Sequence, residues 1–178
     1  MSDEQLKYPI GHFPMPDLIT NEIISQWIDD IASFPGRLRA IITGLSDDQL
    51  NLTYRPGGWT IRQVIHHCAD SHMNSFIRFK LALTEDQPTI KPYYEDRWAE
   101  LPDTKQMTVE SSLKILEGLH ERWTHLLRAL TQTDYARTFY HPETKKTIRL
   151  DENIGIYAWH SNHHLAHIHQ AIKMGVIQ

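Results

Sequence analysis

Four long segments of this sequence repeat apolar residues at the spacing of an amphipathic helix, and this pattern constrains the fold most strongly. The segments cover residues 21–44, 60–86, 109–130 and 151–175. In each segment apolar side chains recur every three or four residues, which places them in one stripe along one face of a helix. A stripe of that length has to be buried against other helices. The sequence therefore predicts an all-α protein, built as a four-helix bundle with long connections.

Capping and turn residues mark the ends of these predicted helices. Thr60 followed by Gln63 is a capping-box pattern, and Asp151 suits the N-cap of the last helix. Pro35 lies inside the first segment. Because proline breaks the hydrogen-bond ladder in mid-helix, we expect one helix kinked near residues 34–35 or two shorter helices.

The connections differ from one another in character. Residues 1–18 carry three prolines and little periodicity, which predicts an extended N-terminal arm. Residues 87–103 hold three further prolines and several aromatic residues, so we expect a loop long enough to cover a site. Residues 136–150 surround a His-Pro-Glu-Thr turn and predict a small hairpin or an extended connection. The length of 178 residues indicates a single domain over residues 1–178.

The composition excludes several classes of function. The single cysteine, Cys68, rules out an internal disulfide and a thiolate-rich zinc site, and it suits a small buried residue in a reducing cytoplasm. A net charge of −4 without any basic run argues against nucleic acid. The N-terminus lacks the pattern of a signal peptide, and no apolar run is long enough for a membrane span. We therefore expect a cytoplasmic protein with a small-molecule substrate, in which 12 histidines are the unusual feature.

Five of these histidines lie in the last helical segment. Imidazoles four residues apart lie on adjacent turns of a helix and can reach one metal ion. The pairs His160/His164 and His163/His167 both have that spacing, so spacing alone leaves the choice open. On a helical wheel His163 and His167 point away from the apolar stripe, whereas His164 and His160 lie about 80° and about 120° from its centre. The wheel favours His160 and His164 as ligands. His163, His167 and His169 are then expected at the rim or surface, where they could orient the ligands.

A third ligand has to come from another helix, and residues 60–86 offer three histidines. On the same construction His72 points into the apolar stripe, as a hydrogen-bonded core histidine would, and His66 points outward. His67 lies on the flank, at the head of a ridge of polar residues. Such a ridge suits the wall of a wet pocket, so His67 is the third predicted ligand.

The polar ridge continues from His67 through Ser71, Asn74 and Arg78. We predict that Asn74 and Arg78 bind a carboxylate or another polar group of the substrate. The alternative for Arg78 is a plain ion pair between helices. Asp70 either orients a ligand or is a surface charge. The histidine cluster as a whole could instead be a solvated face or a pH-sensitive patch, because histidine titrates near neutrality.

Several short motifs in these segments carry a resemblance to a known family. They are "YPIG" near the N-terminus, "GGWT" followed after five residues by "HHCADSHMNS", then "FYHP" and "WHSNHHLAH". Over nearly all of its length the chain resembles the YfiT-like metal-dependent hydrolases of the DinB superfamily. The resemblance implies a DinB-like bundle with up-down-down-up topology, a homodimer, and one divalent ion per subunit held by His67, His160 and His164. It also implies a chemistry that some relatives perform, in which the metal activates a low-molecular-weight thiol such as bacillithiol or mycothiol for transfer to an electrophile.

Three neutral imidazoles leave open positions on a divalent ion, which is typical of a catalytic rather than a structural site. The ion would lower the pKa of a bound water to about 7 or deprotonate a thiol, so the site could serve hydrolysis or bacillithiol-type S-transfer. Zn²⁺ suits a sulfur ligand best, and Ni²⁺ is compatible with imidazole. The alternative function is a non-catalytic metal-binding or stress-response module with a structural ion. A third reading is a pH sensor that binds no metal.

Overall fold

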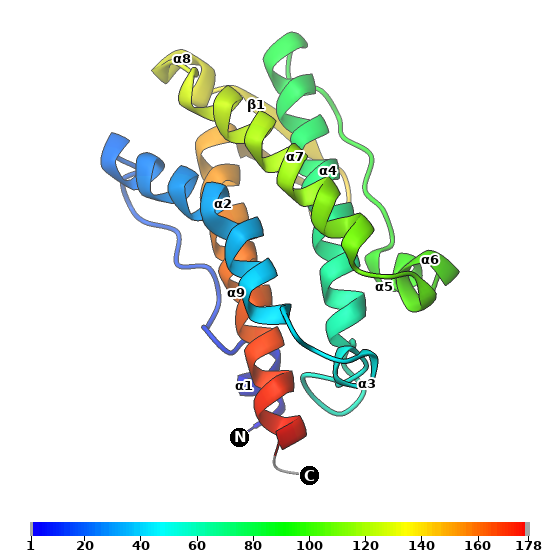
Figure 1. The fold of residues 1–178 in the computed structure, drawn as a ribbon. Coiled ribbons are helices and arrows are strands. Elements are labelled where there is room, and N and C mark those ends of the chain that lie inside the picture. Colours follow the sequence, from blue (N-terminus) through cyan, green and yellow to red (C-terminus); the bar gives the residue numbers. More distant parts are fainter. Residues whose placement is uncertain (1, 177–178) are drawn as a thin grey trace.

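Four long helices form the protein, which is described here by a computed structural model over residues 2–176. They are α2 (Asn21–Ile42), α4 (Ile61–Thr84), α7 (Glu110–Arg128) and α9 (Leu150–Val176). Each packs against two others: α2 and α4 both contact α7 and α9. In Figure 1 α2 and α9 run downwards whereas α4 and α7 run upwards. The all-α fold and its up-down-down-up topology are therefore confirmed.

The connections carry the shorter elements. The long return from the top of α4 to the bottom of α7 is what makes these two helices parallel, and it contains two short helices (Figure 1). The predicted hairpin is present, with Phe139 opposite Ile148 in antiparallel strands. The short elements are α1 (Asp3–Lys7), α3 (Asp47–Leu50), α5 (Glu95–Trp98), α6 (Pro102–Gln106), α8 (Gln132–Tyr135), β1 (Thr138–His141) and β2 (Lys146–Arg149).

Two expectations about the chain ends are wrong in part. The arm over residues 1–18 is not extended throughout, because residues 3–7 form α1 with a capping box between Ser2 and Gln5. Asp151 is not the N-cap, since α9 begins one residue earlier and continues past Gly175. The carboxylate of Asp151 instead forms an ion pair with Arg149, in which Oδ2 lies 2.6 Å from Nη2. The capping box of Thr60 and Gln63 at the start of α4 is confirmed.

Pro35 is accommodated inside α2 without ending it, so α2 is one helix from Asn21 to Ile42. A proline has no N–H to donate to the carbonyl four residues earlier, which here belongs to Ile31. That carbonyl accepts a hydrogen bond from Nδ1 of His120 on α7, at 2.6 Å. A side chain from a neighbouring helix thus satisfies the group that the proline leaves without a helical partner.

The core consists of two apolar clusters with histidines between them. One cluster contains Phe34, Leu38 and Ile65, and the other contains Phe79, Trp123 and their neighbours. The ring of His72 lies 5.2 Å from that of Phe34 and 6.0 Å from that of Trp123. Polar side chains therefore occupy the middle of the bundle, where each needs a partner.

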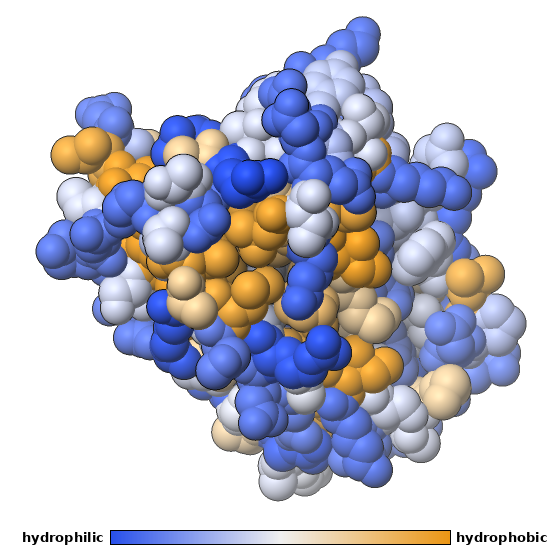
Figure 2. All heavy atoms as spheres, turned by 90° about the horizontal axis from the view of Figure 1, so that it is seen from above, coloured by the Kyte–Doolittle hydropathy of each residue, from blue (hydrophilic) through white to orange (hydrophobic). Residues whose placement is uncertain are grey.

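The upper end of the molecule is seen in Figure 2. Apolar side chains gather in the middle of this face, and hydrophilic side chains surround them. No helix within residues 2–176 is both long enough and apolar enough to span a membrane.

Gly155 on α9 permits the N-terminal arm to lie close to the bundle. A Cβ at this position would lie 2.7 Å from both Phe13 Cζ and Trp27 Cη2. We expect Gly155→Ala to lower the free energy of unfolding by about 1–3 kcal/mol, because the rings have to move apart. Gly118→Ala is the matched control, since nothing lies within 4 Å of its Cβ position on α7. That change should stabilise the protein by about 0.5–1 kcal/mol in urea unfolding. Equal effects of the two changes would contradict this packing of the arm.

Candidate metal centre

The structure brings His67, His160 and His164 together where α4 packs against α9. The Nε2 atom of His160 lies 3.3 Å from Nε2 of His67 and 3.1 Å from Nε2 of His164. One ring nitrogen from each of the three residues lies within 4.8 Å of the others. These are the residues that the helical wheel selects, and their geometry is that of a group able to hold one metal ion.

Burial keeps these three imidazoles neutral. His67 and His164 are buried and His160 is half-buried. Burial, followed by the nearby His167, lowers the pKa of His67 to about 4. Burial also holds the pKa values of His160 and His164 well below the ordinary value. Near pH 7 each ring therefore has one nitrogen with a free lone pair, which is the form that binds metals.

The hydrogen bonds of His164 show which of its nitrogens carries the lone pair. His167 donates from Nε2 to the carbonyl oxygen of Lys7 at 3.0 Å, so its Nδ1 is an acceptor. Nδ1 of His164 lies 3.4 Å from that atom and donates to it. Nε2 of His164 is then without a hydrogen, and it faces Nε2 of His160 and the side chain of His67. A nitrogen lone pair that points at two neighbouring imidazoles in a buried space fits a cation between the rings, so these residues suit a divalent ion.

Two cavities meet at His160. The first has a volume of about 440 Å³, and its walls include all three histidines together with Tyr54, Trp59 and Trp159. The second, of about 480 Å³, is lined by His160, Ser71, Arg78, His141, Asn153 and Tyr157, among others. Glu95 and Asp96 line both. The candidate centre is thus accessible from a space large enough for a small molecule.

Of the two predicted substrate-binding residues, Arg78 lines a cavity and Asn74 is in neither cavity wall. Arg78 lines the second cavity, and within residues 2–176 no carboxylate forms an ion pair with it. The interhelical ion pair is therefore not found. Asn74 donates its side-chain amide to the carbonyl of Asp70, one turn back on α4. Asp70 is half-buried, and burial, followed by the nearby Asp103, raises the pKa of its carboxyl to about 6.

Three histidines are less exposed than expected, although His163 and His167 line the first cavity, as residues at its rim would. His163 and His167 are 7% and 3% exposed, because the N-terminal arm and Tyr54 cover that side of α9. His163 stacks on Trp159, and His167 stacks on Tyr54 at 3.9 Å. His66 does not point into solvent either, since its Nδ1 is hydrogen-bonded to Ser112 Oγ at 2.8 Å.

Other expectations from the sequence are met. His72 is a hydrogen-bonded core histidine, 0% exposed. Cys68 is also 0% exposed, and burial raises the pKa of its thiol. His169 is exposed.

Sequence reasoning missed three features of the site. Glu95 and Asp96 lie in the 87–103 connection, which was expected to be a loop but contains α5 and the first residues of α6. Burial, followed by Asp96 and Glu143, raises the pKa of Glu95. His120 has no histidine partner on its own helix, yet its Nε2 lies 2.7 Å from Nδ1 of His72. Helical periodicity could not predict that the Lys7 carbonyl lies beside His167 and accepts its hydrogen bond.

Several known proteins are similar to this chain in sequence. The model of the DinB superfamily matches residues 31–168. A relative from Oceanobacillus iheyensis is 54% identical over 167 residues, which cover 94% of this chain and 96% of the relative. YfiT of Bacillus subtilis is 49% identical over 168 residues, 94% of either chain. Both are named as candidate metal-dependent hydrolases.

Two solved structures resemble the fold. That of Bacillus subtilis YfiT, described as having an unusual four-helix bundle topology, matches with a TM-score of 0.92 and 49% identity over 96% of this chain and 98% of YfiT. A mycothiol-dependent maleylpyruvate isomerase matches with a TM-score of 0.61 and 12% identity, over 78% of this chain and 57% of the isomerase, which shows a common fold alone. The family model, the sequence relatives and the YfiT structure show that the chain belongs to the DinB superfamily and, within it, to the YfiT-like family of candidate metal-dependent hydrolases.

Proposed function

We propose that this protein is a metal-dependent enzyme in which His67, His160 and His164 hold one divalent ion. The observation that carries the proposal is the convergence of three neutral imidazoles on the wall of a cavity of about 440 Å³. Within residues 2–176 the group contains these three side chains and no fourth. A three-histidine site that faces a cavity favours catalysis over a closed structural site.

The ion would supply Lewis acidity, which lowers the pKa of a water molecule or of a thiol and so generates a nucleophile. In hydrolysis the water oxygen bonds to the electrophilic atom, whose leaving group departs with the bonding electron pair and takes up a proton. In S-transfer a thiol sulfur, of the bacillithiol type, makes that bond, the leaving group departs with its bonding electron pair, and the thiol proton goes to a base. Glu95 and Asp96 line both cavities and are the candidates to accept the proton.

The proposal favours Zn²⁺, because it binds a sulfur ligand well, and Ni²⁺ is also compatible with three imidazoles. The homodimer that the resemblance implies and the cytoplasmic location expected from the composition stay predictions.

The function is tested with metal-free protein and protein reloaded with Zn²⁺ or Ni²⁺. Each form is incubated with chlorodinitrobenzene and several thiols, and separately with p-nitrophenyl esters in water. Metal-dependent product formation in the first assay supports S-transfer, and in the second it supports hydrolysis. Metal that binds and raises the melting temperature, without turnover in either assay, would favour the alternative of a module with a structural ion.

Arg78 is proposed to bind an anionic group of the substrate in the second cavity. Arg78→Met should raise the KM of a carboxylate-bearing thiol such as N-acetylcysteine about tenfold, the value of one charge-assisted hydrogen bond. The KM of cysteamine, which has no carboxylate, should not change. Lys80→Met, two residues further along α4 and outside this cavity, is the control. Equal losses for both thiols would mean that Arg78 is structural.

A further inference from the structure

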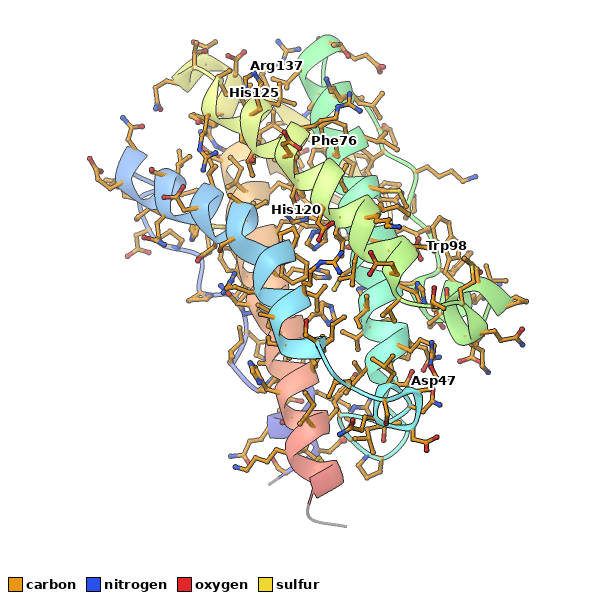
Figure 3. The ribbon with its side chains drawn as sticks, viewed as in Figure 1. Asp47, Phe76, Trp98, His120, His125 and Arg137 are labelled. Atoms are coloured by element: carbon orange, nitrogen blue, oxygen red, sulfur yellow. The ribbon has the colours of Figure 1, made fainter. Side chains whose placement is uncertain are left out.

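The orientation of His160 begins at a proline on another helix. Pro35 leaves the carbonyl of Ile31 without a helical donor, and Nδ1 of His120 lies 2.6 Å from this oxygen. A carbonyl oxygen can only accept, so Nδ1 of His120 carries the hydrogen. Figure 3 shows His120 in the middle of the bundle, between α2 and α7.

The proton position at His120 fixes the next ring. His120 is 1% exposed, and a buried imidazolium without a carboxylate partner is costly, so the ring is neutral. Its Nε2 is therefore an acceptor. Nδ1 of His72 lies 2.7 Å from it and donates the hydrogen of this bond. His72 is 0% exposed and neutral for the same reason, so its own Nε2 is an acceptor.

The last step reaches the candidate metal ligand. Nδ1 of His160 lies 3.1 Å from Nε2 of His72 and has to donate to it. Nε2 of His160 is then without a hydrogen, and this is the atom 3.3 Å from His67 and 3.1 Å from His164. One carbonyl thus determines three ring protons in sequence. Because the rings of His120, His72 and His160 are all neutral, this series of hydrogen bonds places no negative charge beside the metal site.

Packing holds the two intermediate rings in place. His72 and His120 are stacked, with ring centroids 4.9 Å apart and planes inclined by 24°. Phe34 lies 5.2 Å from His72 and 5.5 Å from His120. Trp123 lies at 6.0 and 5.8 Å from the same two rings. These aromatic contacts restrict the ring planes of both imidazoles.

We propose that His72 and His120 are positioning residues of the metal site: together with the Ile31 carbonyl they hold His160 in the tautomer whose Nε2 lone pair faces the ion. Metal-ligating histidines usually donate their other N–H to a carboxylate, a carbonyl or water. Here the N–H of His160 is oriented by the Ile31 carbonyl, which it does not contact directly but reaches through the imidazoles of His72 and His120. This inference rests on the proposed metal site, but which nitrogen of each ring carries the hydrogen can be measured without metal.

The first test is a long-range nitrogen–proton correlation NMR spectrum of the metal-free protein with ¹⁵N-labelled histidine. We expect the hydrogen on Nδ1 in His120, His72 and His160. A hydrogen on Nε2 of His160 would overturn the proposal. This measurement uses the unmodified chain, so it does not depend on the folding of any variant.

The second test compares two replacements of His120. His120→Leu removes the acceptor of His72 and should weaken Zn²⁺ binding about 10- to 100-fold, with a mixture of tautomers at His160. His120→Gln offers a side-chain oxygen to His72 and should restore both the affinity and the tautomer. Thr124→Val is the matched control. Thr124 is buried one turn away and donates to the backbone carbonyl of His120, but it takes no part in the hydrogen bonds between the imidazoles.

The outcomes separate the two proposals. Equal weakening of Zn²⁺ binding by Leu, Gln and the Thr124 control would overturn the positioning role and indicate a general loss of packing. Wild-type protein that shows the expected tautomers but binds neither Zn²⁺ nor Ni²⁺ would contradict the proposed function. If His120→Leu fails to fold, His120→Gln and the wild-type spectrum still decide the case.

Discussion

Replacing His160 by alanine should abolish tight metal binding. The change removes one of three donor nitrogens, whose Nε2 lies within 3.3 Å of both others. It also leaves Nε2 of His72 without its donor. Since the loss of an outer hydrogen bond already costs 10- to 100-fold, we expect the loss of a ligand to weaken Zn²⁺ binding by more than about 100-fold. Elemental analysis of purified protein and competition with a chromogenic chelator measure the effect.

His163→Ala is the matched control for this experiment. His163 lies on the same helix and is 7% exposed, but its ring stacks on Trp159 and lies 5.8 Å from that of Tyr8. We expect this variant to retain its metal, whereas His67→Ala should lose it as His160→Ala does. If His163→Ala empties the site and His160→Ala does not, the assignment of the ligands is wrong.

Periodicity predicted the elements that bury a single face. The four long helices, the Thr60 capping box and the hairpin before α9 depend on local spacing and local turn chemistry, which the sequence displays directly. The same wheel separated His160 and His164 from His163, because the partner helix α4 packs against the flank on which the first two lie. Local patterns therefore sufficed for the bundle and for its three candidate ligands.

The errors arose where a distant segment covers a helix face. A wheel treats the side opposite the apolar stripe as solvent, yet His167 on that side donates to the carbonyl of Lys7, and its ring stacks on Tyr54. His66 is covered in the same way by Ser112 and by the carbonyl of Met107. Contacts between residues more than 40 positions apart leave no periodic trace in either segment, so the wheel could not predict this burial.

His120 could have been found by a different signal. It occupies a stripe position of α7 between Leu116 and Trp123, where a polar residue needs a buried partner. Pro35 marks the matching acceptor, because a proline inside a helix frees the carbonyl four residues earlier. A polar residue in one stripe and a proline in another are complementary, although the sequence alone does not bring α2 and α7 together.

Acidification should destabilise the metal-free protein steeply between about pH 6.5 and pH 4. Burial lowers the pKa values of His67, His120 and His167 to about 4 in the folded protein. In the unfolded chain they return to about 6.5. Between these values the unfolded state binds protons that the folded state does not, so stability is present above pH 6.5 and is lost as the pH falls.

The size of the effect follows from the number of groups. Each such histidine contributes up to about 1.4 kcal/mol per pH unit, so these three alone give about 4 kcal/mol per unit near pH 5. His160 and His164, whose pKa values burial also lowers, add to this slope. A domain of ordinary stability, about 5–15 kcal/mol, loses much of its margin within two pH units at this slope. Urea unfolding of chelator-treated protein at a series of pH values from 7.5 to 4.5 measures the slope.

Metal and variants provide the controls for this prediction. An ion that binds the folded state alone adds to its stability, so loaded protein should unfold at a lower pH than metal-free protein. His120→Gln removes one of these groups and should reduce the slope by up to about 1.4 kcal/mol per pH unit. His169→Gln replaces an exposed histidine of α9 and should leave the slope as it is. A stability that stays constant from pH 7 to pH 5 in the metal-free protein would show that these rings already carry protons in the folded state, and the lone pairs required for the metal site would then be lacking.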